Sequence, residues 1–514
     1  MGGSRMLKTV NKRRVIIVGA GPGGLTSAMI LAHRQFDVTV FEANPTVGGR
    51  NSALRADGFT FDRGPTFLMM RFMLDEMFEE AGRNVEDYLK FKSLDPLYCL
   101  NFDDRNILVS ADHDKMRAQI REHFPGEEKG LDKFLHKERR RYGYLVPVIR
   151  KDYSTLWSLV SVSLLKALPY ASLGRSLFEN LGRYFRDEKL KLSFTFQSKY
   201  MGMSPWQCPA LFTILPFLEH EWGVFHVMGG LNKISEAMAK VVEEEGGKIF
   251  TSTPVESLMI DDGTVRGVKL KSGEEVFADH VIVNADFAYA MSNLVAPGIL
   301  KKYSRNNLQK KDYSCSVFMV YLGVNKLYEM SHHTIVFAKD YRTGMNNIFE
   351  KKILSDDMSF YVQNASVTDP TLAPQGKSTV YILVPVPNRI AAIDWTAEEE
   401  HFKHKVLELV SKRTPMKDLR DHIEVERIIT PQDWEEKHRV YLGATFNLSH
   451  KFSQLLYLRP RNRFEELKHC YLVGGGTHPG SGLPTIYESA RISSDLICKQ
   501  RVTPHQTSSE QARK

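Results

Sequence analysis

A short glycine-rich stretch near the start of the chain has the composition of a phosphate-binding loop. Residues Gly19–Gly24 read GAGPGG and fit the pattern G-x-G-x-x-G between a predicted strand and a predicted helix. Gly19 permits a tight turn, Gly21 lets the backbone approach a pyrophosphate, and Gly24 lets the helix pack closely on the strand. The N-terminus of the helix then turns its N–H groups toward the phosphates. The stretch predicts a dinucleotide site, with Gly23 among its contacts.

Two features downstream favour FAD over NAD. Glu42 ends the next predicted strand, Val38–Phe41, and would accept hydrogen bonds from ribose hydroxyls, which a glycine-rich turn alone does not explain. Gly48, Gly49 and Arg50 then form a second cluster. Its glycines let the backbone pass close to a phosphate or a flavin edge, and its arginine would neutralise the pyrophosphate. A simple NAD dehydrogenase does not need this second cluster.

A third glycine cluster lies near the end of the chain, in Gly474–Pro484. It follows a predicted strand that ends at Val473 and precedes a predicted helix from about Thr485. Such a helix start places a positive dipole against the N1/O2 side of a flavin, which stabilises the reduced, anionic ring. The predicted cofactor contacts here are Gly475, Gly476, His478, Pro479, Gly480 and Gly482. For His478, positioning of the cofactor and a structural role both stay open.

These motifs must be held by a sheet built from distant parts of the chain. Strands rich in β-branched residues are predicted at Val15–Val18, Val276–Asn284 and Cys470–Gly474. We therefore predict an α/β protein with a Rossmann-like FAD-binding domain of the glutathione-reductase type, an inserted α+β substrate domain and a helical part. The predicted boundaries assign 13–110, 223–290 and 439–500 to the FAD-binding domain, 111–222 to the helical segment and 291–438 to the substrate domain with its sheet.

The composition excludes several classes of protein. The chain has 514 residues, of which 42% are hydrophobic and 25% charged, and this excludes a disordered protein, a collagen-like repeat and a disulfide-rich miniprotein. The charge excess of 69 − 61 = 8 is mild and fits anionic lipid headgroups, whereas no nucleic-acid-binding motif is recognisable. Five scattered cysteines without a CxxC pair indicate a reducing compartment and no metal cluster. His332 and His333, adjacent on a predicted strand, are expected to point to opposite faces, which disfavours a metal site.

Motifs outside the nucleotide loop identify a family that the chain resembles. LEHEWGVFHVMGG (Leu218–Gly230), VNAD (Val283–Asp286), YLGATFNLSH (Tyr441–His450) and YLVGGGTHPGSGLP (Tyr471–Pro484) occur in this order. Over nearly its whole length the chain resembles the bacterial-type phytoene desaturases, which are the carotenoid desaturase branch of the flavin amine oxidase superfamily.

The resemblance implies FAD as the cofactor and a membrane-dwelling polyprenoid hydrocarbon as the substrate. Hydrogen would be removed from C–C single bonds next to double bonds. By resemblance, Val255 contributes backbone groups near the adenine, and the Gly474–Gly482 loop holds the flavin. The segment Ser481–Ile486 departs from the commoner family form, small-Gly-Ile-Pro-Gly-Val, which leaves the exact substrate and the number of desaturation steps open.

Desaturation needs acceptors for two hydrogens. Flavin N5 is the expected hydride acceptor, and a carboxylate would take the second hydrogen as a proton in a dry tunnel. Asp187, in the sequence RYFRDE, lies where the family carries an acidic residue suspected in proton handling, and helix capping is the alternative role. Glu219, with Glu221 beside Trp222, is the second candidate, and a surface pair flanking a strand is the alternative.

An apolar stretch in the helical part predicts contact with a membrane. Residues 153–182 hold Leu, Val, Trp and Tyr with few charges; Arg139–Arg141 and Lys151 lie on one side, and Arg183 and Lys189 on the other. An apolar helix pair with basic borders would lie in the interface plane, and a buried core helix is the alternative. Since neither a spanning apolar stretch nor a signal peptide is recognisable, we expect a cytoplasmic protein attached peripherally to the membrane.

Several rival functions fit the same fold. A redox-neutral carotenoid cis-trans isomerase and a polyene saturase would both keep the FAD motifs. An amine oxidase acting on soluble amines would have an aromatic cage and no membrane affinity, and a non-catalytic flavoprotein would leave the intact flavin loop without a purpose. The sequence leaves open a forty- or thirty-carbon substrate, quinone or oxygen as electron acceptor, and the oligomeric state.

Overall fold

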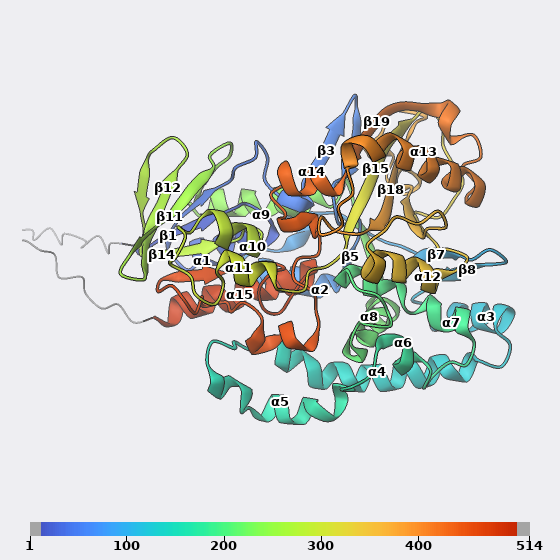
Figure 1. Cartoon of the computed structure of the whole chain (residues 1–514), viewed down its shortest axis with the longest axis horizontal. Helices are drawn as coiled ribbons and strands as arrows, with labels where there is room; N and C mark the ends of the chain where they lie inside the picture. The colour runs from blue at the N-terminus through green and yellow to red at the C-terminus, as the bar shows by residue number, and fades with distance from the viewer. Residues whose placement is uncertain (1–11, 501–514) are drawn as a thin grey trace, which may run out of the picture.

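The computed structural model describes residues 12–500, and its first layer is a parallel five-stranded sheet with the order β10-β2-β1-β14-β20 (Figure 1). The central strand, β1, consists mainly of β-branched residues that are buried on both faces, as is usual in parallel sheets. The predicted assembly of distant segments into one sheet is therefore present. The strands are β1 (Arg14–Val18), β2 (Asp37–Phe41), β10 (Lys248–Phe250), β14 (His280–Val283) and β20 (Cys470–Leu472).

Helices cover one face of this sheet, and a small antiparallel sheet covers the other. The helices are α1 (Pro22–His33), α2 (Arg71–Glu80), α9 (Asn232–Glu244) and α15 (Leu483–Lys499). The small sheet comprises β11 (Val255–Asp261), β12 (Thr264–Leu270) and β13 (Glu275–Phe277), and α10 (Phe287–Asn293) and α11 (Arg305–Gln309) lie beside it. The single strand predicted over Val276–Asn284 is wrong, because the chain passes from one sheet to the other between β13 and β14.

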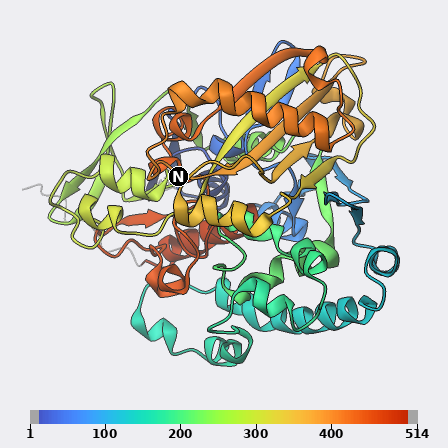
Figure 2. The same ribbon diagram turned by 45° about the vertical axis from the view of Figure 1, so that its right-hand side comes forward.

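A seven-stranded sheet with the order β19-β15-β18-β17-β16-β7-β8 forms a second large part (Figure 2). The helix α13 (Trp395–Arg413) crosses one face of this sheet and packs its apolar side chains on β15 and β18. The strands are β7 (Tyr98–Asn101), β8 (Asn106–Val109), β15 (Ser316–Val324), β16 (His333–Val336), β17 (Phe360–Gln363), β18 (Ser378–Val386) and β19 (Ile423–Ile429), with α12 (Tyr341–Asn346) and α14 (Pro431–Glu436) nearby.

The remaining helices form a third part along the lower edge of Figure 1. They are α3 (His113–His123), α4 (Glu128–Ile149), α5 (Val162–Ala167), α6 (Leu177–Leu181), α7 (Glu188–Ser193) and α8 (Ile214–Trp222). α4 is amphipathic and buries Leu131, Phe134 and Leu135 in the largest core cluster. Short strands complete the chain: β3 (Ala53–Ala56), β4 (Phe59–Asp62), β5 (Leu68–Met69), β6 (Phe91–Ser93) and β9 (Val224–Val227).

The domain boundaries stay predictions. One observation bears on the first of them: β7 and β8 lie inside the predicted 13–110 segment but join the seven-stranded sheet through β16. Over residues 12–500, none of the helices combines the length and the hydropathy that crossing a membrane requires.

Candidate functional site

A pocket of about 240 Å³ lies at the carboxyl edge of the parallel sheet. Its walls include residues that follow β1, β2, β14 and β20, so distant segments of the chain meet there. Ligands of open α/β sheets bind at this edge. The predicted cofactor residues that line the pocket are Gly19, Gly21, Gly23, Glu42, Gly49, Arg50, Val255, Gly475 and Gly476.

The loop Gly19–Gly24 leaves no room for side chains at its helical end. A Cβ on Gly24 would lie 2.2 Å from the carbonyl oxygen of Gly19, and one on Gly23 would lie 2.8 Å from Oδ1 of Asn284. Asn284, which the sequence analysis did not single out as a site residue, donates from Nδ2 to the carbonyl of Gly19 at 3.0 Å. Gly24 thus serves helix packing, whereas Gly19, Gly21 and Gly23 face the pocket.

Glu42 lines the pocket and also holds the loop. Its Oε2 accepts from the backbone N–H of Ala20 at 2.8 Å, and its Oε1 accepts from the backbone and side-chain nitrogens of Asn44 at 2.8 and 2.7 Å. The carboxylate is buried and oriented by these bonds. It is therefore fixed beside the pocket, where the sequence predicts a ribose.

Arg50 is already paired with a carboxylate. It donates to Oδ2 of Asp286 and to the carbonyl of Thr445, each at 2.8 Å. Asp286 also caps α10 by accepting from the N–H of Tyr289 at 3.3 Å. Arg50 therefore fixes the wall of the pocket in addition to lending its charge, and Gly48, with φ of 107°, makes the left-handed turn that precedes it.

A second arginine in the pocket wall, Arg63, has a hydrogen-bond donor without an acceptor among the described residues. Within the described residues, Nε of Arg63 is buried without a hydrogen-bond partner, and burial lowers the pKa of this guanidinium. A half-buried cation facing a groove lined by glycine backbone suits an anionic ligand. The glycine cradle, the ribose-side carboxylate and this arginine together fit the diphosphate and ribose of FAD.

The closing loop, residues 474–482, touches the pocket only through its first glycines. His478 instead faces away from it: Nε2 donates to the carbonyl of Lys151 at 3.0 Å, and the ring lies 4.9 Å from that of Tyr153. Burial lowers the pKa of His478 to about 4, so the ring is neutral. Pro479 follows it, and neither residue lines the pocket.

Two further glycines of the closing loop are needed for its shape. A Cβ on Gly480 would lie 2.6 Å from Nε2 of His450. Gly482 has φ of 111° and is the N-cap of α15. These positions, like His478 and Pro479, were predicted as cofactor contacts; they are not among the residues that line the pocket, and their contact with the cofactor stays a prediction.

Arg459 supports the closing loop and escaped the sequence analysis. Its side chain is fully buried, and it donates to backbone carbonyls only, including those of Gly475 at 2.7 Å and Thr477 at 3.2 Å. The other acceptors are the carbonyls of Leu448, Ser449 and Gln454. Burial lowers the pKa of Arg459 to about 9. An isolated arginine that binds carbonyls carries no motif from which it could have been predicted.

Glu219 lies in a buried cluster of polar aromatic groups. It belongs to α8, its exposed fraction is 0%, and its Oε2 accepts from the hydroxyl of Tyr98 and from Nε2 of Gln197, each at 2.7 Å. Its Oε1 accepts from the hydroxyl of Tyr200 at 3.2 Å. Burial raises the pKa of Glu219 to about 7, although the three donors oppose the rise. The alternative of a surface pair flanking a strand is wrong, because the residue is helical and buried.

Two neighbouring acids lie at the surface or close to it. Asp187 is exposed and caps α7 by accepting from the N–H of Leu190 at 3.0 Å, which is the alternative role that the sequence allowed. Glu221 is paired with Arg139 at 2.6 Å. Within the described residues, Glu219 is therefore the predicted proton acceptor that combines burial with a raised pKa.

An aromatic and histidine cluster adjoins Tyr200, whose hydroxyl donates to Glu219. The ring of Phe67 is 5.7 Å from that of Tyr200 and 5.2 Å from that of His333. The rings of His332 and His333 are 4.3 Å apart, so they lie together, contrary to the prediction of opposite faces, because β16 begins only at His333. In residues 12–500 no group of His, Cys, Asp and Glu is arranged to hold a metal ion.

The fold has the amine oxidase architecture, and the pocket has the position and the lining of a dinucleotide site. The chain aligns over 95% of its length with putrescine oxidase (TM-score 0.62, 15% identity, 99% of that chain). It also aligns with an oxidoreductase from Methanosarcina mazei (TM-score 0.61, 18% identity, 95% of this chain and 100% of that chain). At these identities the likeness concerns the fold alone.

Sequence comparison shows the family to which the chain belongs. Residues 22–498 match the family described as flavin containing amine oxidoreductase. The chain is 56% identical to a 4,4'-diapophytoene desaturase (4,4'-diapolycopene-forming) of Methylomonas sp, over 95% of this chain and 96% of that protein. It is 37% identical to a zeta-carotene-forming phytoene desaturase of Myxococcus xanthus, over 96% of this chain and 95% of that protein. The chain belongs to the flavin containing amine oxidoreductase family, in its carotenoid desaturase branch, and its cofactor is FAD.

Proposed function

We propose that the protein is an FAD-dependent desaturase of a linear carotenoid precursor, with 4,4'-diapophytoene as its substrate. The observation that carries the proposal is the 56% identity, over almost the full length of both chains, to a desaturase named for that compound. Relatives named for phytoene are more distant, at 37% identity or below. The thirty-carbon precursor is therefore favoured over the forty-carbon one.

Bound FAD supplies the acceptor for the first hydrogen, which leaves an allylic carbon as a hydride. The second hydrogen leaves the neighbouring carbon as a proton, and the carboxylate of Glu219 accepts it. The raised pKa suits this role, because a base works best when its pKa lies near the working pH. The hydroxyls of Tyr98 and Tyr200 hold the carboxylate in one orientation.

The surroundings of Glu219 favour a hydrocarbon cation. Phe67, Tyr200 and Phe196 lie in one contiguous aromatic cluster, with ring centroids less than 6 Å apart. Aromatic faces attract cations most strongly where water is excluded. Such a lining stabilises positive charge on a polyene through its aromatic faces.

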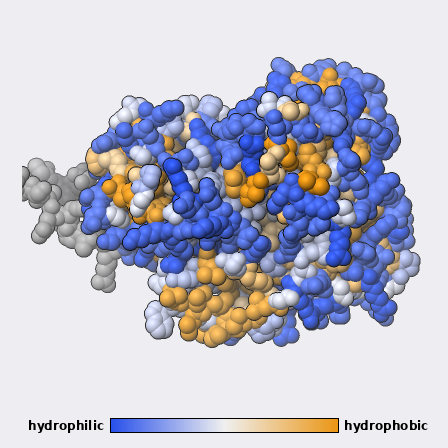
Figure 3. Space-filling model, in the orientation of Figure 1, coloured by the Kyte–Doolittle hydropathy of each residue, from blue (hydrophilic) through white to orange (hydrophobic). Residues whose placement is uncertain are grey.

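Docking on a membrane is the second part of the proposal. The apolar segment, defined as residues 156–173, includes α5 and exposes large hydrophobic side chains, of which Trp157 is 82% exposed. Figure 3 shows hydrophobic residues gathered along the lower edge of the molecule, where Figure 1 places α5. The exposed members are Leu156, Trp157, Val160, Val162, Leu165, Leu168 and Leu173. The buried-core alternative is not what the structure shows.

Basic residues accompany this face and support an anionic lipid surface as the partner. Arg140, Lys166 and Arg175 are exposed close to the apolar segment in the chain or in space. Apolar side chains that enter the interface, with cations at its border, are the features of peripheral membrane binding. A quinone dissolved in the same bilayer would then be the accessible electron acceptor, with oxygen as the alternative.

The deciding experiment is an anaerobic assay with FAD-loaded protein. 4,4'-Diapophytoene and phytoene are supplied separately in phosphatidylcholine–phosphatidylglycerol vesicles, and the flavin absorbance and the extracted polyenes are recorded. We expect the flavin band to bleach and conjugated products to form faster with 4,4'-diapophytoene. Equal rates would reject the substrate assignment, and the absence of bleaching with either compound would reject the desaturase. Isomerised product at unchanged flavin oxidation state would favour the isomerase.

A further inference from the structure

A short stretch of chain, residues 150–154, joins the apolar segment to the end of α4 and contacts the flavin-binding part; we call it the root. A single residue, Thr155, separates the root from the apolar segment. Tyr153 in the root is almost completely buried, and Val148 and Ala167 share its small core cluster. The root therefore has little freedom to move independently of the segment that it carries.

The root contacts the closing loop directly. His478 donates from Nε2 to the carbonyl of Lys151 at 3.0 Å, and its ring packs edge-on against Tyr153 at 4.9 Å. Arg461, in the stretch that precedes β20, donates to the carbonyl of Ser154 at 3.4 Å. His478 lies in the middle of the closing loop, two residues after Gly476, which lines the FAD pocket. The side chain of His478 thus touches the root, and its residue lies two positions along the chain from a glycine that lines the FAD pocket.

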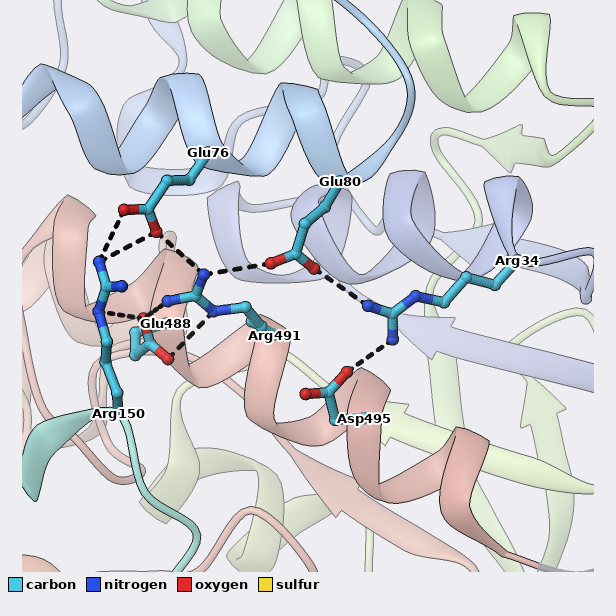
Figure 4. A network of polar contacts seen from close by, with 7 residues as sticks. All are labelled: Arg34, Glu76, Glu80, Arg150, Glu488, Arg491 and Asp495. Atoms are coloured by element: carbon cyan, nitrogen blue, oxygen red, sulfur yellow. Dashed lines mark hydrogen bonds and ion pairs between the residues drawn. The ribbon is translucent and has the colours of Figure 1, made fainter. Parts of the chain in front are cut away.

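An ion-pair network makes a second connection (Figure 4). Arg150 in the root donates to both oxygens of Glu76 on α2, at 2.9 and 3.0 Å. Arg491 on α15 donates to the same Glu76 at 2.9 Å and also pairs with Glu488. Glu488 is almost fully buried, and α15 is the helix that begins at the end of the closing loop. The root is thereby linked to the second and third turns of α15, through Glu488 and Arg491.

We infer that His478 is a positioning residue that couples docking of the apolar segment to the geometry of the closing loop. The inference rests on the proposed membrane docking. A surface shifts a conformational equilibrium only if the two states contact it differently. The apolar segment provides this difference, since its position relative to the body decides how much of it enters the bilayer. When the apolar segment takes the position that the bilayer favours, the root moves with it, and the contact of the root with His478 moves the closing loop beside FAD.

The hydrogen bond between Nε2 of His478 and the carbonyl of Lys151 holds the closing loop at a fixed distance from the root. The imidazole of His478 is buried and neutral, and within the described residues its Nδ1 has no hydrogen-bond partner. Its single bond to the root is therefore the polar contact that orients the ring. Losing that bond would leave a buried N–H unsatisfied, which is costly. A movement of the root is consequently expected to move the closing loop with it.

The test is hydrogen exchange of residues 474–482 with and without phosphatidylcholine–phosphatidylglycerol vesicles, on the FAD-loaded full chain. We expect vesicles to slow exchange of these amides by about fivefold or more, the lower end of typical coupling between sites. His478→Phe keeps an aromatic ring against Tyr153 but removes the donor, and it should abolish the response while it sediments with vesicles as before. His478→Gln, which restores a donor, should recover it. His404→Phe, an exposed histidine on α13, is the matched control.

The outcomes separate the inference from the docking proposal. If the unmodified protein does not sediment with vesicles, the docking proposal fails. If it sediments and exchange in the closing loop is unchanged, docking stands and the coupling is rejected. A response that survives in His478→Phe also rejects it. Should this variant fail to fold, His478→Gln, which keeps a donor toward the root, carries the test: a folded His478→Gln protein that sediments with vesicles but shows no slowing of exchange rejects the inference.

Discussion

At the scale of single residues, the environment of Glu219 determines what its carboxylate can do. Three donors hold it while burial raises its pKa to about 7. In a dry interior an ionised carboxylate needs such donors, and a neutral one can share them. The residue is thus poised between the two forms at physiological pH, as a proton acceptor must be.

We expect Glu219→Gln to lower kcat by about 10²-fold, because general-base catalysis contributes at least that much. For the unmodified enzyme, kcat should rise with pH through about 7, since the carboxylate is protonated below its pKa and accepts a proton only above it. The variant should lose this limb. The measurement is the initial rate of polyene formation against pH.

Glu221→Gln is the matched control for this experiment. Glu221 lies on the same helix, two residues away, and pairs with Arg139 near the surface. Its substitution should leave both kcat and the pH limb unchanged. If Glu219→Gln retained full activity with the limb intact, Glu219 would not be the proton acceptor.

The sequence singled out Glu219 but not its partners. Tyr98 and Gln197 lie 121 and 22 residues away along the chain, and their hydroxyl and amide meet the carboxylate only in the fold. Asp187 carried the stronger motif argument, yet local chemistry at a helix start explains it fully. A sequence motif predicts residues whose role depends on their neighbours along the chain. Burial cannot be predicted in this way, because it depends on residues that come together only in the folded core.

At the scale of elements, the apolar segment exposes hydrophobic side chains that lower the solubility of the protein and that the proposed docking requires. Monomeric proteins rarely expose contiguous apolar surface without a partner for it. Its helix α5 has six residues, which is too short for the segment to form an independent core. The segment is stable because its inner side packs on α4 and on the root.

We expect the double substitution Trp157→Asp and Leu165→Asp to weaken vesicle binding by at least about tenfold, because burial of each apolar side chain contributes ~1.5–3 kcal/mol. The measurement is cosedimentation with phosphatidylcholine–phosphatidylglycerol vesicles. Activity on substrate dissolved in detergent should be retained. Since both side chains are exposed, folding should not suffer.

Ile390→Asp supplies the control, because Ile390 is 54% exposed, close to the 59% of Leu165, but lies outside the apolar segment. It should not change sedimentation. If the double variant bound vesicles as tightly as the unmodified protein, the apolar segment would not be the docking surface.

The elements themselves were partly predictable. The strand–loop–helix unit at Arg14–His33 has a run of buried β-branched residues and glycine chemistry that leave few alternatives. The split between β13 and β14 was missed because both pieces read as one apolar stretch, and only pairing with different sheets separates them. The apolar segment was recognised from composition, but its exposure depends on what the rest of the chain leaves uncovered.

At the scale of the whole molecule, FAD holds distant segments together. The pocket is lined by residues that follow β1, β14 and β20, which come from the beginning, the middle and the end of the chain. A ligand that binds only the folded state stabilises it by about 2.7 kcal/mol at 100 times its Kd. Added FAD should therefore raise the Tm of the apoprotein, as measured by differential scanning calorimetry.

FMN provides the comparison, because it lacks the adenosine half that the predicted contacts at Glu42 and Val255 would hold. We expect a smaller rise in Tm with FMN at equal concentration. Equal stabilisation by the two flavins would show that the adenosine end of the pocket contributes nothing, and would contradict the assignment of Glu42 and Val255.

The order of strands in the parallel sheet has a consequence for biosynthesis. β1 and β2 leave the ribosome before their neighbour β14, which follows after more than two hundred residues, and β20 with α15 comes later still. Cofactor capture must then wait until β20 and the closing loop have been synthesised. The apolar segment, by contrast, is synthesised before β14 and β20. A nascent chain could thus encounter the membrane before it can hold a flavin, so that maturation of the enzyme would take place at the surface where it works.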